Sequence, residues 1–305
     1  MIVRCEEELA AAFEDERPYL RRLAYGTLGS FAEADDIVQE AWLRLQRADL
    51  EPIRDLRGWL TTVVGRLALD ALGSARNRRE RYVGPWLPEP LVADVAAGDP
   101  AERVTLDEQV TTALLVVLEA LSPAERTAFV LHDVFGLPFA EVAEVVGRSP
   151  AAVRQLAARA RRHVADGTPR FPASREQHTR IVAAFAIAWQ AGDVDALLAV
   201  LDPGVTFRSD GGGHVVAARR PVDGAERVAR TLVALAAANV RRGVAVRGGI
   251  VDVNGMPGLL LEEDDVRGVV SLTVDDGRIV AIDVVRNPEK LRHVPALPDD
   301  AVGAP

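Results

Sequence analysis

The apolar positions near the start of the chain recur with the spacing of amphipathic helices. Ser30 followed by Glu33 is a capping-box pattern and predicts a helix start. A second helix is expected from about residue 56, after a break that contains Pro52. The pattern therefore predicts helices over residues 4–81. The apolar face of the first of these two helices consists of Ile37, Val38, Ala41, Trp42 and Leu45.

Helical spacing returns over residues 106–165. Ser122, Pro123 and Glu125 form a strong start signal, with serine as the N-cap, proline at the first position and glutamate three residues after the cap. This helix is expected to end at Gly136.

A short helix is then predicted to end at Gly147, and Ser149 with Pro150 opens another one after a tight turn. This layout is that of a helix-turn-helix, whose second helix enters the major groove of DNA. The apolar residues expected to join the two helices are Val142, Val145, Val146, Val153, Leu156 and Ala160.

The C-terminal part mixes helix and strand patterns. One helix is expected over residues 175–191, followed by Gly192, and two hairpin turns are expected at Asn254-Gly255 and Asp276-Gly277. A helix followed by consecutive strands predicts an α+β domain with a curved, antiparallel or mixed sheet. The runs read as strands are 205–208, 214–218, 240–246, 259–262, 266–274 and 279–285.

The whole chain is accordingly expected to be multidomain, with two all-α domains and one α+β domain. Four prolines between residues 82 and 105 mark a linker, although Trp86 and Leu87 are too apolar for a purely solvated one. The expected parts are a first helical domain at 1–82, the linker at 83–106, a helix-turn-helix domain at 107–168, the α+β domain at 169–292 and a flexible tail at 293–305.

Composition narrows the class of protein. The chain has 305 residues, a net charge of -9 and one cysteine, so it can form no internal disulfide and is not a nonspecific nucleic-acid coat. The acidic N-terminus does not fit a secretory signal, and no apolar run approaches the ~18 residues of a membrane span. We expect a cytoplasmic protein without a membrane segment. Zinc-ligand spacings, Walker loops and nucleophile elbows do not occur, so no metal, cofactor or catalytic residue is expected.

Positive charge gathers on the second helix of the helix-turn-helix. Residues 149–164 contain four arginines and no acid, a local charge of +4. Arg154 and Gln155 lie in the first turns, where side chains reach base edges, and Arg161 and Arg162 lie further along, where phosphate contacts are expected, with Arg159 between them. The alternative is an ordinary solvated helix.

A second basic cluster, Arg76, Arg78 and Arg79, ends the helix that begins near residue 56. It suits contacts with the DNA backbone, but basic residues at a helix C-terminus also complement the helix dipole. The polar face of the helix after Ser30 is likewise a solvated face on spacing alone. That face consists of Asp35, Asp36, Gln39, Glu40 and Arg44.

These stretches resemble the sigma factors of bacterial RNA polymerase. Residues 34–45 resemble the polymerase-binding segment of sigma region two, and residues 57–60 and 68–70 resemble the part that reads and melts the minus-ten box. Residues 121–126 with the helix-turn-helix resemble region four, which reads the minus-thirty-five box. The order and spacing over residues 4–166 are similar to those of the extracytoplasmic-function (ECF) group.

The resemblance implies an alternative sigma factor, a specificity subunit that binds core RNA polymerase and promoter DNA. Asp35, Asp36, Gln39, Glu40 and Arg44 would face the coiled coil of the polymerase β′ subunit, and region four would meet the β flap. The break at 47–55 would hold a flipped minus-ten base. Pro138 stands where this family commonly has a serine or threonine cap.

The C-terminal part resembles the SnoaL-like cone fold, and three short stretches resemble those of the SigJ-like ECF subgroup, in which a fused domain regulates the factor in cis. His214 stands after the glycines where a lysine is expected. The resemblance assigns regulatory contacts to Trp86, Leu87, Pro88, Glu89, Pro90, Asp210, Gly211, Gly212, Gly213, Asn287, Pro288, Glu289, Lys290 and Leu291.

Two other functions fit parts of the sequence. A free-standing regulator could combine the helix-turn-helix with a small ligand in the cone, but it leaves residues 34–45 unexplained. A DNA-tethered cyclase or isomerase could use Asp210 and His214, with His178 and Asp283 behind them. We favour a turn at residues 210–213 that docks on Trp86, and expect no enzyme activity.

Overall fold

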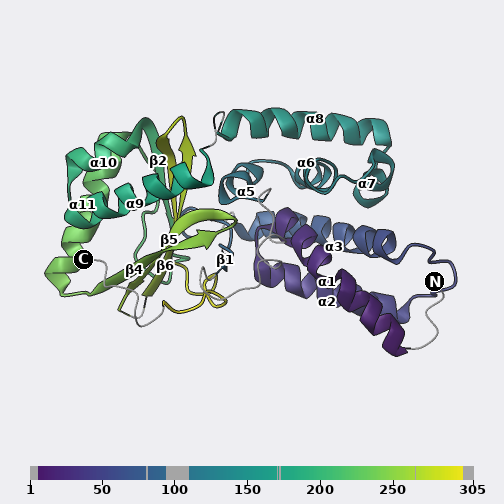
Figure 1. The fold of residues 1–305 in the computed structure, drawn as a ribbon. Helices are drawn as coiled ribbons and strands as arrows, with labels where there is room; N and C mark the ends of the chain where they lie inside the picture. Colours follow the sequence, from purple (N-terminus) through teal and green to yellow (C-terminus); the bar gives the residue numbers. More distant parts are fainter. Residues whose placement is uncertain are drawn as a thin grey trace. The chain divides into compact units, whose positions relative to one another are not determined.

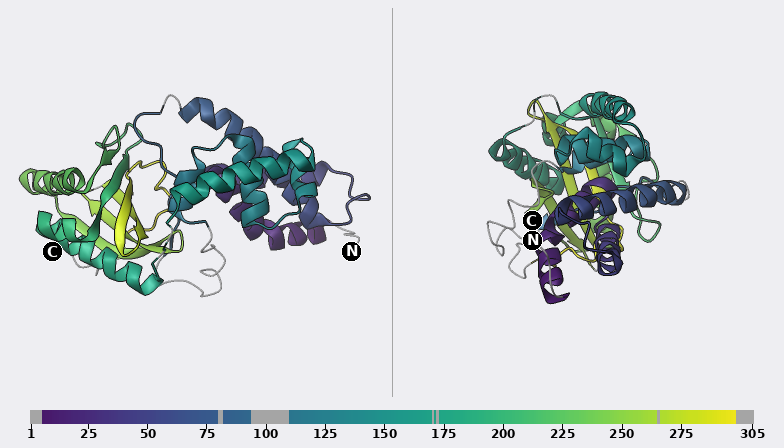
Figure 2. Two further views of the ribbon diagram at one scale, coloured as in Figure 1. Left: turned by 90° about the horizontal axis from the view of Figure 1, so that it is seen from above. Right: turned by 90° about the vertical axis from the view of Figure 1, so that its right-hand side faces the viewer.

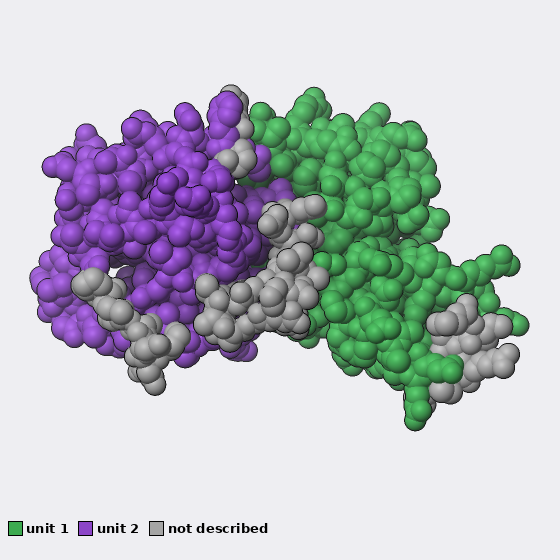
Figure 3. Space-filling model, in the orientation of Figure 1, with its two compact units in different colours: residues 1–80, 117–167 green, residues 81–116, 168–305 purple. Residues whose placement is uncertain are grey.

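The computed structural model describes residues 6–79, 82–93, 110–169, 171, 173–264 and 266–297. The chain forms two compact units, of which the first comprises residues 1–80 and 117–167 and the second residues 81–116 and 168–305 (Figure 3). The division falls inside one helix, α5, between Val116 and Val117. The described part of the linker therefore belongs to the same unit as the C-terminal domain.

Three long helices open the first unit, α1 (Glu6–Leu28), α2 (Phe31–Arg47) and α3 (Leu56–Arg79). Ser30 caps α2 as expected, because its side chain accepts a hydrogen bond of 3.2 Å from the backbone N–H of Glu33. The predicted apolar face of α2 is buried except at Trp42, which is half-buried and lies 5.0 Å from the ring of Phe13.

The later helices of the chain are α5 (Thr112–Leu118), α6 (Pro123–Phe129), the π-helical turn η1 (Val130–Val134), α7 (Phe139–Val146) and α8 (Pro150–Gly167). Both halves of the capping box at Ser122 are formed, and Gly136 and Gly147 have positive φ angles of 72° and 68°. All six apolar residues expected to join α7 and α8 are buried. The predicted helix-turn-helix is confirmed. Pro138 is the N-cap of α7 and gives it no side-chain hydrogen bond.

The N-terminal helices and the helix-turn-helix pack together within the first unit. Gly65 on α3 lies so close to α7 that a Cβ atom there would be 2.9 Å from Val145. Next to it, Arg66 donates a hydrogen bond of 3.1 Å to the carbonyl of Glu144.

The second unit contains a seven-stranded sheet with the order β1-β4-β5-β6-β7-β2-β3. Strands β2 and β7 are parallel and the other neighbours are antiparallel, so the sheet is mixed, and it does not close on itself. The hairpin turns at Asn254-Gly255 and Asp276-Gly277 are confirmed. The strands are β1 (Val92–Ala93), β2 (Leu201–Asp210), β3 (Val222–Asp223), β4 (Val246–Val253), β5 (Met256–Glu263), β6 (Val266–Asp275) and β7 (Arg278–Val285).

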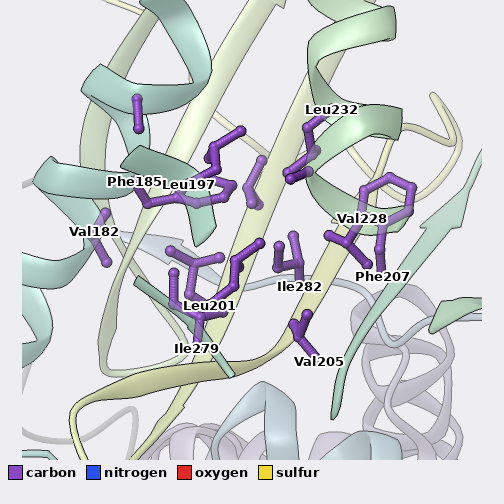
Figure 4. Close-up of a cluster of buried hydrophobic side chains, with 14 of the residues drawn as sticks. Val182, Phe185, Leu197, Leu201, Val205, Phe207, Val228, Leu232, Ile279 and Ile282 are labelled. Atoms are coloured by element: carbon purple, nitrogen blue, oxygen red, sulfur yellow. The ribbon is translucent and has the colours of Figure 1, made fainter. Parts of the chain in front are cut away.

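Helices α9 (Arg175–Ala191), α10 (Val194–Val200) and α11 (Ala225–Arg242) gather on one face of the curved sheet (Figures 1 and 2). The space between them is filled by a large apolar cluster that includes Phe185, Phe207, Leu232 and Ile282 (Figure 4). This helix-then-sheet layout is the expected α+β cone, and its interior holds tightly packed side chains.

The opposite face of the sheet is apolar as well, because successive residues of a strand point to opposite faces. Leu259 belongs to the cluster under the helices, whereas its neighbour Leu260 belongs to a second cluster. Besides residues of β4 to β7, this second cluster includes Leu87 and Val92 from the linker, Val116 from α5, and Leu291, Val294 and Leu297 after β7. The linker and the C-terminal segment therefore cover a sheet face that would otherwise expose apolar area to water.

Two predicted strands are wrong. Residues 214–218 form a loop in which Val216 is 83% exposed. Residues 240–242 are the last residues of α11, which is capped by Gly243 at a φ of 67°. Helices α10 and α11 are absent from the sequence-based expectation. None of the helices in the described part of the chain is long and apolar enough to cross a membrane.

Candidate functional site

Asp210 ends strand β2 and is completely buried. Its two carboxylate oxygens accept four hydrogen bonds, from the Tyr82 hydroxyl (2.7 Å), the Gly212 N–H (3.0 Å), the Leu87 N–H (2.9 Å) and the Lys290 ammonium (2.8 Å). Two of these donors come from the linker, about 125 residues earlier in the chain. A buried carboxylate thus serves as the point to which the linker is attached.

Lys290 is the cation that balances this charge. Its side chain is 8% exposed, and its ammonium also bonds the Leu87 carbonyl and lies 3.9 Å from the ring centroid of Trp86. An ammonium over an aromatic face is stabilised by the ring quadrupole, the more so when it is desolvated. The apolar linker residue Trp86 is therefore explained by its contact with Lys290.

Tyr82 connects the same carboxylate to a third segment. Its hydroxyl donates to Asp210 and accepts a hydrogen bond of 2.8 Å from the side-chain amide of Asn287. Burial, followed by the hydrogen bond and the negative charge of Asp210, raises the pKa of Tyr82 above its ordinary range. The phenol consequently stays protonated and remains a donor. We name the Asp210 cluster as Tyr82, Trp86, Leu87, Asp210, Asn287 and Lys290.

The glycines after Asp210 allow this close packing. Gly212 has a φ of 62°, and a Cβ atom there would lie 2.4 Å from the Asn287 amide nitrogen. At Gly211 a Cβ atom would lie 2.4 Å from the Val215 carbonyl oxygen. Side chains are excluded by contact at both positions, and at Gly212 by backbone geometry as well.

The structure brings together the three stretches assigned to regulation. Pro88, Glu89, Pro90, Asn287, Lys290 and Leu291 are buried, whereas Gly213, Pro288 and Glu289 are exposed. The exposed His214 lies 3.9 Å from Glu289, which is an ion pair only when the imidazole is protonated.

Several residues of this region escaped the sequence analysis. Contacts that join the third domain to the chain before it also involve Tyr82, Thr112, Asn254 and His293. The last of these, His293, bonds to the Pro90 carbonyl at 2.9 Å. The sequence marks Asn254 only as a turn residue, and no local pattern marks Thr112 or His293. Tyr82 lies four residues before Trp86, next to a linker that is too apolar to be fully solvated. That position is the sequence signal that could have indicated its contact with the third domain.

The four candidate catalytic side chains are not joined to one another by any hydrogen bond or ion pair among the described residues. Asp210 has all its acceptor positions used. Asp283 is held by Arg208 in a two-point ion pair of 2.6 and 3.1 Å. Burial raises the pKa of Asp283, although the charge and the hydrogen bond of Arg208 act in the opposite direction. His178 is 2% exposed, and burial, followed by the charge of Arg175, lowers its pKa.

The predicted polymerase-binding face lies on α2, where Asp35, Asp36 and Gln39 line a polar cleft together with Arg17 and Arg21 of α1. Asp35 pairs with Arg21 at 2.6 Å.

Further along the same face, Glu40 pairs with Arg44 at 3.0 Å. Asp36 is exposed and forms no ion pair within the described part of the chain, so it is the acid on this face best able to meet a cation on a partner.

All five predicted DNA-contacting residues of α8 are exposed, but they are not equivalent. Arg159 pairs with Glu125 at 2.7 Å, and Arg161 pairs with Asp133 at 2.5 Å. Arg162 forms no ion pair among the described residues.

Arg154 on the same helix lies 5.6 Å from the ring centroid of Phe139. The side chains of Arg76, Arg78 and Arg79, at the end of α3, lie outside the described part of the structure.

Comparison with known proteins agrees with this organisation. The Sigma-70 region 2 family model matches residues 12–78, and the Sigma-70, region 4 model matches residues 111–164. The ECF RNA polymerase sigma factor SigJ of Mycobacterium tuberculosis is 44% identical over 299 residues, which is 93% of each chain. The probable ECF RNA polymerase sigma factor SigI of the same species is 40% identical over 288 residues, covering 93% of this chain and 95% of its own.

The fold agrees over nearly the same length. The crystal structure of M. tuberculosis SigJ matches with a TM-score of 0.77 and 40% identity, covering 93% of this chain and 98% of that one. Two sigma regions in the family order, together with relatives similar over almost the whole length, establish that the chain belongs to the extracytoplasmic-function family of RNA polymerase sigma factors.

Proposed function

We propose that the C-terminal domain regulates this sigma factor in cis, without catalysis, by holding the linker between regions two and four. The Asp210 cluster is the observation that carries the proposal. Its carboxylate and its lysine bind linker residues 82–87, so the conformation of the linker depends on the folded C-terminal domain. The two regions must read promoter elements at a set spacing, and a restrained linker limits the spacings they can reach.

The state of two of the candidate groups, Asp210 and Asp283, supports a role without catalysis. A general base needs a free lone pair within reach of a substrate. Asp210 already accepts four hydrogen bonds, Asp283 is held in a two-point ion pair by Arg208, and the centre of the cone is filled with apolar side chains. These features also argue against a small ligand in the core of the cone.

For polymerase binding we propose that α2 meets the coiled coil of the β′ subunit, with Asp36 as its main charged contact, and that region four meets the β flap. Asp36→Lys should weaken the binding of core polymerase more than Glu40→Lys, since Glu40 is already paired with Arg44. Gln46→Lys, an exposed position on the same helix, is the matched control for an added positive charge. Equal binding of Asp36→Lys and the control in a pull-down would refute this contact.

For promoter binding we propose that α8 reads the minus-thirty-five box through Arg154 and Gln155, with Arg159, Arg161 and Arg162 near the phosphates. Arg76, Arg78 and Arg79 are proposed to contact the DNA backbone near the minus-ten box. The supporting observation is the exposure of all five α8 side chains on one helix of a complete helix-turn-helix.

The regulatory proposal is tested by comparing a point variant with a truncation. Asp210→Asn replaces a carboxylate that accepts four hydrogen bonds by an amide, in which an NH2 donor takes the place of one acceptor oxygen. This substitution should release the linker. Transcription from a cognate promoter should change in the same direction for Asp210→Asn as for a chain truncated after residue 167.

Asp195→Asn, an exposed aspartate on α10, should behave like the unaltered protein. Regulation through the Asp210 cluster is excluded if Asp210→Asn retains normal activity while the truncated chain does not.

A further inference from the structure

Asn254 occupies an unusual environment for a turn residue. It is the first residue of the two-residue turn between β4 and β5, with a φ of 51°, and Gly255 follows at 77°. Turns of this kind usually project into water, because they lie at the end of a hairpin. Asn254 is only 3% exposed. Something other than its own hairpin therefore covers it, and that cover is the linker.

Asn254 binds the linker on both sides of residues 94–109. On the N-terminal side its backbone N–H donates to the Leu91 carbonyl (2.8 Å) and its Oδ1 accepts from the Leu91 N–H (3.2 Å). On the C-terminal side its Nδ2 donates to the Val110 carbonyl (3.4 Å) and its Oδ1 accepts from the Thr112 hydroxyl (3.3 Å). One amide side chain thus joins two segments that lie about 20 residues apart. We name Leu91, Val110, Thr112 and Asn254 the Asn254 junction.

The neighbouring contacts extend the same attachment. Val92 and Ala93 pair with Val253 and Asp252 to add β1 to the edge of the sheet. The Thr112 hydroxyl also lies 3.2 Å from that of Ser271. In addition, Val116 packs against the apolar cluster on the outer face of the sheet.

The C-terminal side of the junction belongs to region four. The match to region four begins at residue 111, and α5 begins at Thr112. The Asp210 cluster binds residues 82–87, whereas Val110 and Thr112 are bound by Asn254. The C-terminal domain therefore has two separate attachments, one to the chain that follows region two and one to the first helix of region four.

From this arrangement we propose that Asn254 is the positioning residue that couples the C-terminal domain to region four. It holds Leu91 and Val110 at one turn, and so fixes the start of α5. The coupling rests on the proposed regulation in cis and adds a second, independent contact to it. Loss of the Asn254 side chain loosens the start of α5 while the Asp210 cluster stays intact.

The decisive variant is Asn254→Gly, because glycine accepts the positive φ and the hairpin can keep its turn. Asp276→Gly is a matched control, since Asp276 begins the other two-residue turn at a φ of 46° and its side chain is exposed. Thr112→Val removes the hydroxyl from the other side of the junction while it keeps the shape of the side chain.

Hydrogen exchange on the free full-length protein tests the coupling without polymerase. In Asn254→Gly the amides of Leu91 and of residues 114–118 should exchange about tenfold faster, while the amide of Leu87 in the Asp210 cluster keeps its rate. Thr112→Val should have a smaller effect in the Asn254→Gly background than on its own, because the bond between the two residues is already lost and only the contact with Ser271 remains. The proposal is overturned if residues 114–118 are unaffected, if Leu87 changes equally, or if the two substitutions are additive.

Transcription from promoters with altered spacing gives the functional readout. Asn254→Gly should accept a wider range of distances between the minus-thirty-five and minus-ten boxes than the unaltered protein and Asp276→Gly. An unchanged range of distances would overturn the coupling. The two proposals can fail separately. If Asp210→Asn leaves transcription unchanged while Asn254→Gly still accelerates exchange at residues 114–118, regulation through the Asp210 cluster is refuted and the Asn254 junction is supported.

Discussion

Lys290 and Asp210 form an ion pair of 2.8 Å in which the lysine side chain is 8% exposed and the aspartate not at all. Desolvation of two charges costs several kcal/mol per ion, so such a pair persists only with further bonds to both partners. Those bonds come from the linker, through the Leu87 N–H and carbonyl and the ring of Trp86. The buried ion pair is therefore stable only while the linker is docked, and the linker docks only while the pair is formed.

Lys290→Met should destabilise the C-terminal domain by about 3–5 kcal/mol, because it leaves the Asp210 carboxylate buried without a counter-charge. Adding Asp210→Asn to Lys290→Met should recover part of this loss, since the double variant buries no charge. Chemical denaturation of the full-length protein, followed by tryptophan fluorescence, measures both variants. A Lys290→Met protein as stable as the unaltered one would mean that the pair is solvated in solution.

The stability of the C-terminal domain should fall as the pH drops below about 6.5, because of His178. Its pKa in the folded state lies below the ordinary 6.5, so the unfolded chain takes up the proton first as the pH falls. The contribution of His178 is thus complete above that value and is lost below it, at up to about 1.4 kcal/mol per pH unit.

Thermal melting between pH 7.5 and 5.0 measures this loss. His178→Phe should flatten the profile in that window even if its absolute stability is lower. An equally steep profile in His178→Phe would assign the pH dependence to other groups.

Salt dependence should separate the arginines of α8. Each phosphate contact that is lost lowers the slope of log binding constant against log salt by about 0.9. Arg162→Ala should show this change, whereas Arg161→Ala should show less, because Asp133 already neutralises Arg161 at 2.5 Å. Holoenzyme binding to labelled promoter DNA over a potassium chloride series gives the slopes. A larger effect for Arg161→Ala would reverse the assignment.

Local signals on the chain were sufficient for most helices of the sigma regions. The caps at Ser30 and Ser122 and the left-handed Gly147 depend on residues next to one another, and all three are formed as expected. The hairpins at Asn254 and Asp276 followed from the same kind of short-range rule.

The errors arose where a short apolar run was read without its context. Residues 240–246 are rich in β-branched valine, but their first part continues α11, an alanine-rich helix that begins at Ala225 and ends at Gly243. Residues 214–218 lack a partner strand, and Val216 points into solvent. Helical propensity over a long window outweighs β-propensity over a few residues.

The sites were predictable to different degrees. Resemblance indicated the three stretches of the Asp210 cluster, but the four bonds to the Asp210 carboxylate come from residues up to 128 positions away in the chain. Likewise, nothing near Asn254 in the sequence indicates that a turn residue binds Leu91 and Thr112. Contacts of this separation are fixed by the tertiary fold, and local patterns do not contain them.

The two glycines after Gly211 provide a test of how tightly the Asp210 cluster is packed. Gly212 and Gly213 both have positive φ angles, 62° and 79°, so alanine at either position bears a similar backbone cost of about 1 kcal/mol. At Gly212 the new Cβ would also collide with the Asn287 amide, which bonds Tyr82, whereas at Gly213 it would lie 3.4 Å from Val83.

Gly212→Ala should therefore be the more destabilising substitution by about 1–3 kcal/mol, as expected for overpacking. Only this variant should accelerate exchange at the Leu87 amide, since a displaced Asn287 no longer holds Tyr82 against Asp210. Denaturation and hydrogen exchange on the two variants give both quantities. If the variants lost equal stability, backbone strain alone would explain the glycines, and the turn could not be part of the contact that holds the linker.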